Sequence, residues 1–257
     1  LELNKQTNYA AYIAVAVWHF YLLNNDINFL QNFWKPVKKG ILFSLSLQHN
    51  NGAIAWNIDE SDKIDEDYLL TGCSSIAKSL ECAIAICQVL EHQSIESEWR
   101  DAHSKLIVAL ENPAEIFDLK KDRSRFSMDW YYPILGGINS KQRITSLIEN
   151  IEDSFWIKGL GIKCVSDEPW VTVAETSECS IAYKKIGEDK IASELLLNAI
   201  AIVDKEGIPY MGWQFYENIY WPEETPSWTS AACILAADAN NQLTPGADLF
   251  IKQQFKL

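Results

Sequence analysis

The side chains that could do chemistry are carboxylates and large aromatic rings, which recur together between the expected helices. Asp129 stands directly before Trp130 and Tyr131. The aromatic candidates for ligand binding are Trp56, Trp130, Tyr131, Trp170, Trp213, Tyr216, Trp221 and Trp228. An indole can stack on the apolar face of a sugar ring, and carboxylates accept hydrogen bonds from its hydroxyls. These residue types favour a small-molecule or oligosaccharide ligand.

Three carboxylates are the catalytic candidates, namely Asp129, Glu175 and Glu224. Two carboxyl groups across a cavity could act as acid and base on a glycosidic bond, and their separation would decide between retention and inversion. We expect the aromatic residues after Asp129 to desolvate it and raise its pKa, which suits a general acid. Its alternative role is helix N-capping.

Each of the other acidic candidates also has a structural alternative. Glu175 has capping-box spacing from Thr172 and could close the start of a helix. Glu178, one turn later, is a candidate for substrate binding, or it satisfies buried backbone groups. Glu224 lies in a segment broken by Pro222, where it could simply rim a cleft.

Composition excludes several classes of function. The net charge of −13 over 257 residues argues against nucleic-acid binding, which needs a basic surface. The six cysteines show no CxxC spacing and the four histidines no ligand spacing, so we expect reduced thiols, a cytoplasmic protein, no metal and no cofactor. We expect no membrane span. The chain begins at Leu1 without a start signal, which suggests a lost N-terminal segment.

Long connectors alternate with short ones, and each long connector precedes an apolar helix. The expected helices are 9–23, 26–48, 68–90, 96–111, 130–138, 140–154, 172–186, 188–203, one beginning near 227, and 246–255. The pattern predicts an all-α fold, an α/α toroid of helical hairpins with the long connectors over one mouth. One domain over 1–257 would hold about five of six hairpins and lack an N-terminal one. An open α-solenoid is the alternative, but no fixed repeat period is present.

Three stretches carry a family resemblance: MDWYYPILGG (128–137), GLGIKCVSDEPWVTVAETSE (159–178) and YWPEETPSWTSAACILAADA (220–239). They resemble an uncharacterised bacterial family that carries the automatic name "prenyltransferase". The layout is more distantly similar to six-hairpin glycosidases of the glucoamylase and unsaturated-glucuronyl-hydrolase kind. Those enzymes share the α/α toroid with terpenoid cyclases and protein prenyltransferases, so the resemblance supports the fold better than it supports a particular activity.

We therefore expect a carbohydrate-processing protein that is glycoside-hydrolase-like. One alternative is a prenyltransferase or terpenoid-cyclase-like enzyme acting on an isoprenoid. The zinc ligand set of protein prenyltransferases is not placed here, although the basic run 120–125 could take a diphosphate. Another alternative is a non-catalytic carbohydrate-binding protein. The sequence does not indicate an oligomeric state.

Overall fold

A computed structural model describes residues 4–65 and 67–256, which divide between two compact units. Unit 1 is Leu1–Asp122 with Gly136–Ser140 and Gln253–Leu257, and unit 2 is Arg123–Leu135 with Lys141–Lys252. Each unit is mostly helical, as the sequence predicts. In the described residues the strands are short; one precedes the first helix and the others lie in connectors between helices.

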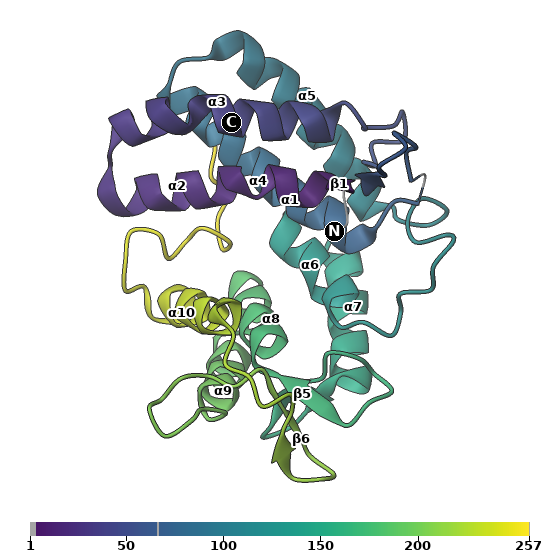
Figure 1. The fold of residues 1–257 in the computed structure, drawn as a ribbon, viewed down its shortest axis with the longest axis vertical. Helices are drawn as coiled ribbons and strands as arrows, with labels where there is room; N and C mark the ends of the chain where they lie inside the picture. Colours follow the sequence, from purple (N-terminus) through teal and green to yellow (C-terminus); the bar gives the residue numbers. More distant parts are fainter. Residues whose placement is uncertain (1–3, 66, 257) are drawn as a thin grey trace. The chain divides into compact units, whose positions relative to one another are not determined.

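Unit 1 consists of helices packed around a buried one. Its elements are β1 (Lys5–Gln6), α1 (Thr7–Ala11), α2 (Ile13–Asn24), α3 (Ile27–Leu45), β2 (Asn57–Ile58), α4 (Leu70–Val89) and α5 (Gln93–Glu111). Helices α2 and α3 lie side by side as one hairpin, and α4 packs against both α5 and α2 (Figure 1). The expected pairing of consecutive helices is confirmed here.

Helix α4 is the core helix of unit 1. Its length and apolar composition would suffice to cross a membrane, contrary to our expectation that no run would, but 89% of its most apolar window is buried within the protein. It also buries Lys78 and Glu81, whose Nζ and Oε1 atoms are 2.8 Å apart. A helix buried on all sides needs apolar residues all round, which explains the composition.

Two expectations for the first helices are wrong in detail. The composition of 9–23 predicts one helix buried on every side, but the stretch breaks at Tyr12 into α1 and α2. Tyr9 and Phe20 are 66% and 38% exposed, so it is not buried all round. Asp26 caps α3 as expected, accepting a hydrogen bond from the Phe29 amide at 3.1 Å. For α3 the spacing predicts an apolar face of Phe29, Phe33, Val37, Leu42 and Leu45, but the buried face consists of Leu30, Val37, Ile41 and Ser44.

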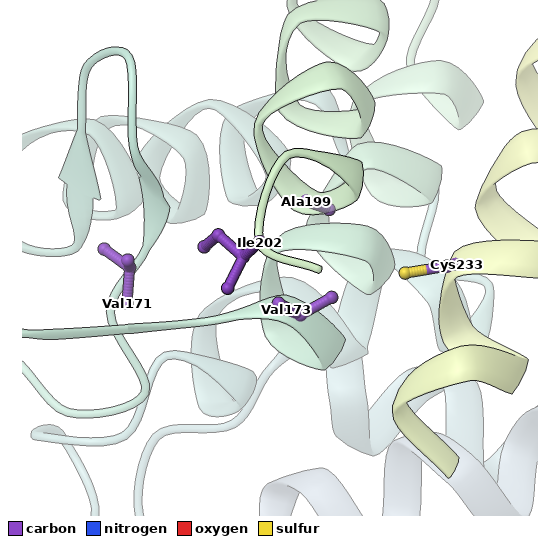
Figure 2. Close-up of a cluster of buried hydrophobic side chains, with 5 residues drawn as sticks. All are labelled: Val171, Val173, Ala199, Ile202 and Cys233. Carbon is purple, nitrogen blue, oxygen red and sulfur yellow. The ribbon is translucent and has the colours of Figure 1, made fainter. Parts of the chain in front are cut away.

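Unit 2 carries the residues of interest. Its elements are α6 (Met128–Gly136, whose last residue belongs to unit 1), α7 (Lys141–Ser154), β3 (Trp156–Ile157), β4 (Gly161–Ile162), β5 (Trp170–Thr172), α8 (Val173–Lys185), α9 (Asp189–Ile200), β6 (Gly212–Gln214), β7 (Ile219–Tyr220) and α10 (Ser227–Asn241). Helix α8 packs against both α9 and α10. Figure 2 shows the buried cluster between them, formed by Val171, Val173, Ala199, Ile202 and Cys233.

The connectors of unit 2 are more regular than the sequence indicated. Strands β5, β6 and β7 form an antiparallel sheet, in which Val171 pairs with Trp213 and Trp213 pairs with Tyr220. The expected final helix, 246–255, is absent from the described residues, where 244–252 forms successive turns instead. The Asp238 carboxylate accepts hydrogen bonds from the Thr244 amide and hydroxyl at 2.8 and 2.6 Å, and these bonds fix the first turn.

All six cysteines are free thiols, five of them buried and Cys164 half-buried. Burial raises the pKa of the Cys73 thiol to about 12, so it is protonated and unreactive at neutral pH.

Candidate active site

Helices α6 and α8 meet through the carboxylate of Glu178, a half-buried residue. The Tyr131 hydroxyl donates a hydrogen bond to Oε2 of Glu178 at 2.7 Å, and the Tyr132 hydroxyl donates to Oε1 at 3.2 Å. The two tyrosines are consecutive on α6, and Tyr131 is fully buried. Each carboxylate oxygen of Glu178 thus has its own phenolic donor, which fixes the orientation of the carboxyl group.

The environment of Glu178 favours its protonated form. Desolvation of the carboxyl group, followed by the charge of Glu175, raises the pKa of Glu178 to about 7, against the lowering effect of the two tyrosine hydrogen bonds. Burial and the Glu178 charge together raise the pKa of Tyr131 well above its ordinary value, so this phenol keeps its proton. A carboxyl group that is partly protonated at neutral pH suits a general acid.

Glu175 lies on the same helix, one turn before Glu178, and is half-buried. The predicted capping box is wrong, because Thr172 is the N-cap of α8 but its side chain makes no capping hydrogen bond. Glu175 instead interacts with the Cys164 thiol, whose pKa is raised to about 12 by burial and then by Glu175. The Glu175 carboxylate is therefore not used to close the helix start.

The connector before α8 joins the starts of α6 and α8. The Ser127 amide, just before α6, donates to the carbonyl of Cys164 at 3.0 Å, and the Cys164 amide donates to the carbonyl of Trp170 at 3.3 Å. The first turns of two helices are thereby tied to one segment.

Asp129 sits in the first turn of α6 and is only 5% exposed. Its Oδ2 atom is 3.2 Å from Nε of Arg123, whose guanidinium also lies 4.6 Å from the centre of the Phe126 ring. The tyrosines that we expected to desolvate Asp129 contact Glu178 instead. The structure therefore places the tyrosine-lined, partly protonated carboxyl group at Glu178, which the sequence suggested only as a substrate-binding residue.

The β5–β6–β7 sheet gathers several of the aromatic candidates. The rings of Trp170 and Trp221 meet edge to face with centroids 5.2 Å apart, and Nε1 of Trp170 donates to the carbonyl of Trp221 at 2.5 Å. Trp213 packs on the buried cluster of unit 2 and meets Tyr220 at 5.0 Å. Trp213 is therefore part of the core of the unit rather than an open ligand surface.

The remaining candidates are not brought into these two groups. The side chains of Tyr216 and Trp228 are 80% and 61% exposed, and Glu224 is exposed while its backbone carbonyl accepts from the Met211 amide at 2.8 Å. Trp130 donates through Nε1 to the carbonyl of Ser124 at 3.0 Å. Trp56 belongs to unit 1, where the Lys121 ammonium lies 5.0 Å from its ring centre.

The sequence carries no functional signal for Cys164, and it suggested other roles for Tyr132, expected to desolvate Asp129, and for Arg123, in the basic run 120–125. The signal for Tyr132 was available, because it directly follows Tyr131 in the motif. Gly212, which pairs with Thr172 of β5 and lies beside the Trp170 indole, could not be found from spacing, since its place depends on strand register. Within residues 4–65 and 67–256, no group of three or more His, Cys, Asp or Glu side chains is gathered as a metal site would require.

The chain matches a known glycosidase over nearly all of its length. It is 37% identical over 249 residues to the MMP endo-(1,4)-3-O-methyl-alpha-D-mannosidase of Mycolicibacterium hassiacum, covering 97% of this chain and 68% of that protein. No family model matches the chain. The name "prenyltransferase", which came with the resemblance, is not supported by this relative.

Solved structures show the fold. A rhamnosidase from Klebsiella oxytoca superposes with a TM-score of 0.65 at 11% identity, covering 91% of this chain but only 46% of the rhamnosidase. A GH63 mannosylglycerate hydrolase from Thermus thermophilus gives a TM-score of 0.66 at 12% identity, covering 88% and 74% of the two chains. These similarities confirm the predicted α/α-toroid, six-hairpin-glycosidase-like fold class. The chain belongs to the family of the MMP endo-(1,4)-3-O-methyl-alpha-D-mannosidase and is a glycosidase-like, carbohydrate-processing protein.

Proposed function

We propose that this protein is an endo-acting α-mannosidase that cleaves 1,4-linkages within a chain of 3-O-methylmannosyl units. The family relative has this activity by name and is 37% identical over 97% of the chain. The observation that carries the proposal is the Glu178 carboxyl group, which is oriented by two tyrosines beside Glu175. Glycosidases require one carboxyl group that is still protonated at the working pH.

Glu178 is the proposed proton donor. As the bond between the anomeric carbon and the glycosidic oxygen breaks, its proton passes to the departing oxygen, and the released chain leaves as an alcohol. The tyrosine hydroxyls then stabilise the carboxylate that remains, since a hydrogen bond to an ionised group is stronger than one to a neutral group. Proton donation is thus favoured by groups already in place.

Glu175 is the proposed ionised partner. Its negative charge helps keep the proton on Glu178 before reaction and stabilises the positive charge that develops on the sugar ring as the bond breaks. Asp129, in the first turn of α6, is the candidate for the base that activates the attacking water. Asp129→Asn tests this role, because loss of the base should abolish turnover while sparing affinity.

The test uses an α-(1→4)-linked 3-O-methylmannose chain and follows the lengths of the products. We expect the wild type to produce fragments of intermediate length early in the reaction and Glu178→Gln to produce almost none. Glu152→Gln is the matched control, because Glu152 also accepts a tyrosine hydrogen bond, from Tyr183 at 3.3 Å, but is exposed. Release of single sugars only, or no cleavage by the wild type, would contradict the proposal.

A further inference from the structure

One face of the β5–β6–β7 sheet carries large apolar side chains, Trp170 and Ile219, that are not among those packed on the buried cluster of unit 2. Residues alternate between the two faces of a strand, so Val171 and its partner Trp213 share the face that packs on the buried cluster. Trp170 and Gln214, paired in the next register position, share the other face with Ile219, which is 46% exposed. The solvent-facing side of an antiparallel sheet is usually polar.

Gly212 allows the indole of Trp170 to lie across β6. A Cβ atom at position 212 would come within 2.6 Å of Nε1 of Trp170 and 2.5 Å of the carbonyl oxygen of Val171. The absence of a side chain there lets the indole approach the neighbouring strand closely. The position of Trp170 is therefore fixed before any ligand arrives.

Trp221 completes a pair of fixed rings on this surface. Its backbone carbonyl accepts the Nε1 hydrogen of Trp170 at 2.5 Å, its ring meets Trp170 edge to face, and it is 52% exposed. Because the indole of Trp170 has a single N–H donor, and that donor is bound to backbone, its ring can contact a ligand only through apolar surface and its π-system. Such a surface suits an apolar ligand group, for example a hydroxyl whose hydrogen is replaced by a methyl group.

We propose that Trp170 and Trp221 form a binding subsite for an O-methylated mannosyl unit of the substrate chain. This inference rests on the proposed function, because the substrate class is taken from it. Strand β5 runs from Trp170 directly into α8, which carries Glu175 and Glu178, so the subsite and the carboxylates belong to one continuous segment. The methyl ether contacts the indole rings, and a free hydroxyl at that position lacks the same apolar contact.

The test measures the binding of two tetrasaccharides by calorimetry, one of α-(1→4)-linked 3-O-methylmannose and one of α-(1→4)-linked mannose. Burying one methyl group favours the methylated ligand about fourfold in Kd in the wild type. Trp221→Ala is expected to weaken binding of the methylated ligand about tenfold and to abolish the preference. Tyr9→Ala is the control, since Tyr9 is an exposed aromatic residue of unit 1 that also contacts a second ring, Tyr12, with centroids 5.8 Å apart.

Trp221→Phe retains a ring and guards against a folding defect in the alanine variant. We expect Trp221→Phe to keep most of the affinity for both ligands. Together with weakened binding in Trp221→Ala, that result would support a ring-stacking role. Unchanged affinity in Trp221→Ala, or equal weakening for both ligands, would overturn the subsite. If the wild type binds through Trp221 but cleaves neither ligand, the subsite stands and the proposed hydrolase function fails. If the wild type cleaves both ligands and Trp221→Ala binds them with unchanged affinity, the proposed hydrolase function stands and the subsite fails.

Discussion

Removing the hydroxyl of Tyr131 should move the pH dependence of catalysis to higher pH. This hydroxyl donates to Oε2 of Glu178 at 2.7 Å and so favours the ionised carboxylate. A hydrogen bond to a charged group contributes about 1.5–3 kcal/mol, and one pKa unit corresponds to about 1.4 kcal/mol. Tyr131→Phe should therefore raise the pKa of Glu178 from about 7 by about one to two units.

The assay measures kcat/KM as a function of pH on the α-(1→4)-linked 3-O-methylmannose chain, called here the methylated mannan chain. Because Glu178 must be protonated to act as the acid, the activity falls as pH rises through its pKa, and this falling limb should shift upward in Tyr131→Phe. Tyr183→Phe is the matched control, because it removes a tyrosine hydroxyl that donates to Glu152 at 3.3 Å instead. A uniform loss of activity in Tyr131→Phe, with the falling limb unmoved, would refute the assignment of Glu178 as the acid.

Three further predictions concern stability, measured by urea unfolding. Between pH 4.5 and 7 the folded protein binds more protons at Glu178 than the unfolded chain, so the free energy of unfolding falls as pH rises. Relative to Glu178→Gln, the wild type should lose about 3 kcal/mol between pH 4 and 8, and parallel curves for the two proteins would contradict this. Gly212→Ala should cost about 1–3 kcal/mol because its new methyl group has no space; a neutral result would show that the neighbouring strand yields. Lys78→Met should cost about 3–5 kcal/mol by leaving Glu81 buried without this partner, whereas Lys205→Met, at an exposed pair, should change stability little.

The fold could be predicted largely from apolar patterning. The stretch 70–89 is rich in small and apolar residues and becomes the buried helix α4, and Asp26 caps α3 as its residue type suggests. The error at 9–23 has the same origin, because its apolar residues also suggested burial but Tyr9 and Phe20 are exposed. Periodicity reports which residues could be buried, while tertiary packing decides which are.

The site was only partly predictable. The motif around Asp129 identified α6 as functional, yet the carboxyl group with the raised pKa is Glu178, whose environment comes from another helix through Tyr131 and Tyr132. The two segments are far apart in sequence, so no local spacing reveals the contact. The pairing of Trp170 with Trp221 likewise depends on strand register and on Gly212, neither of which a single sequence specifies.

The most direct test compares two leaving groups in Glu178→Gln. A sugar leaving group needs a proton, whereas 2,4-dinitrophenolate leaves without one. If Glu178 is the proton donor, the variant should lose kcat on the methylated mannan chain by about a hundredfold or more and retain most of its kcat on 2,4-dinitrophenyl 3-O-methyl-α-mannoside. Equal losses on both substrates would contradict the proposed role of Glu178.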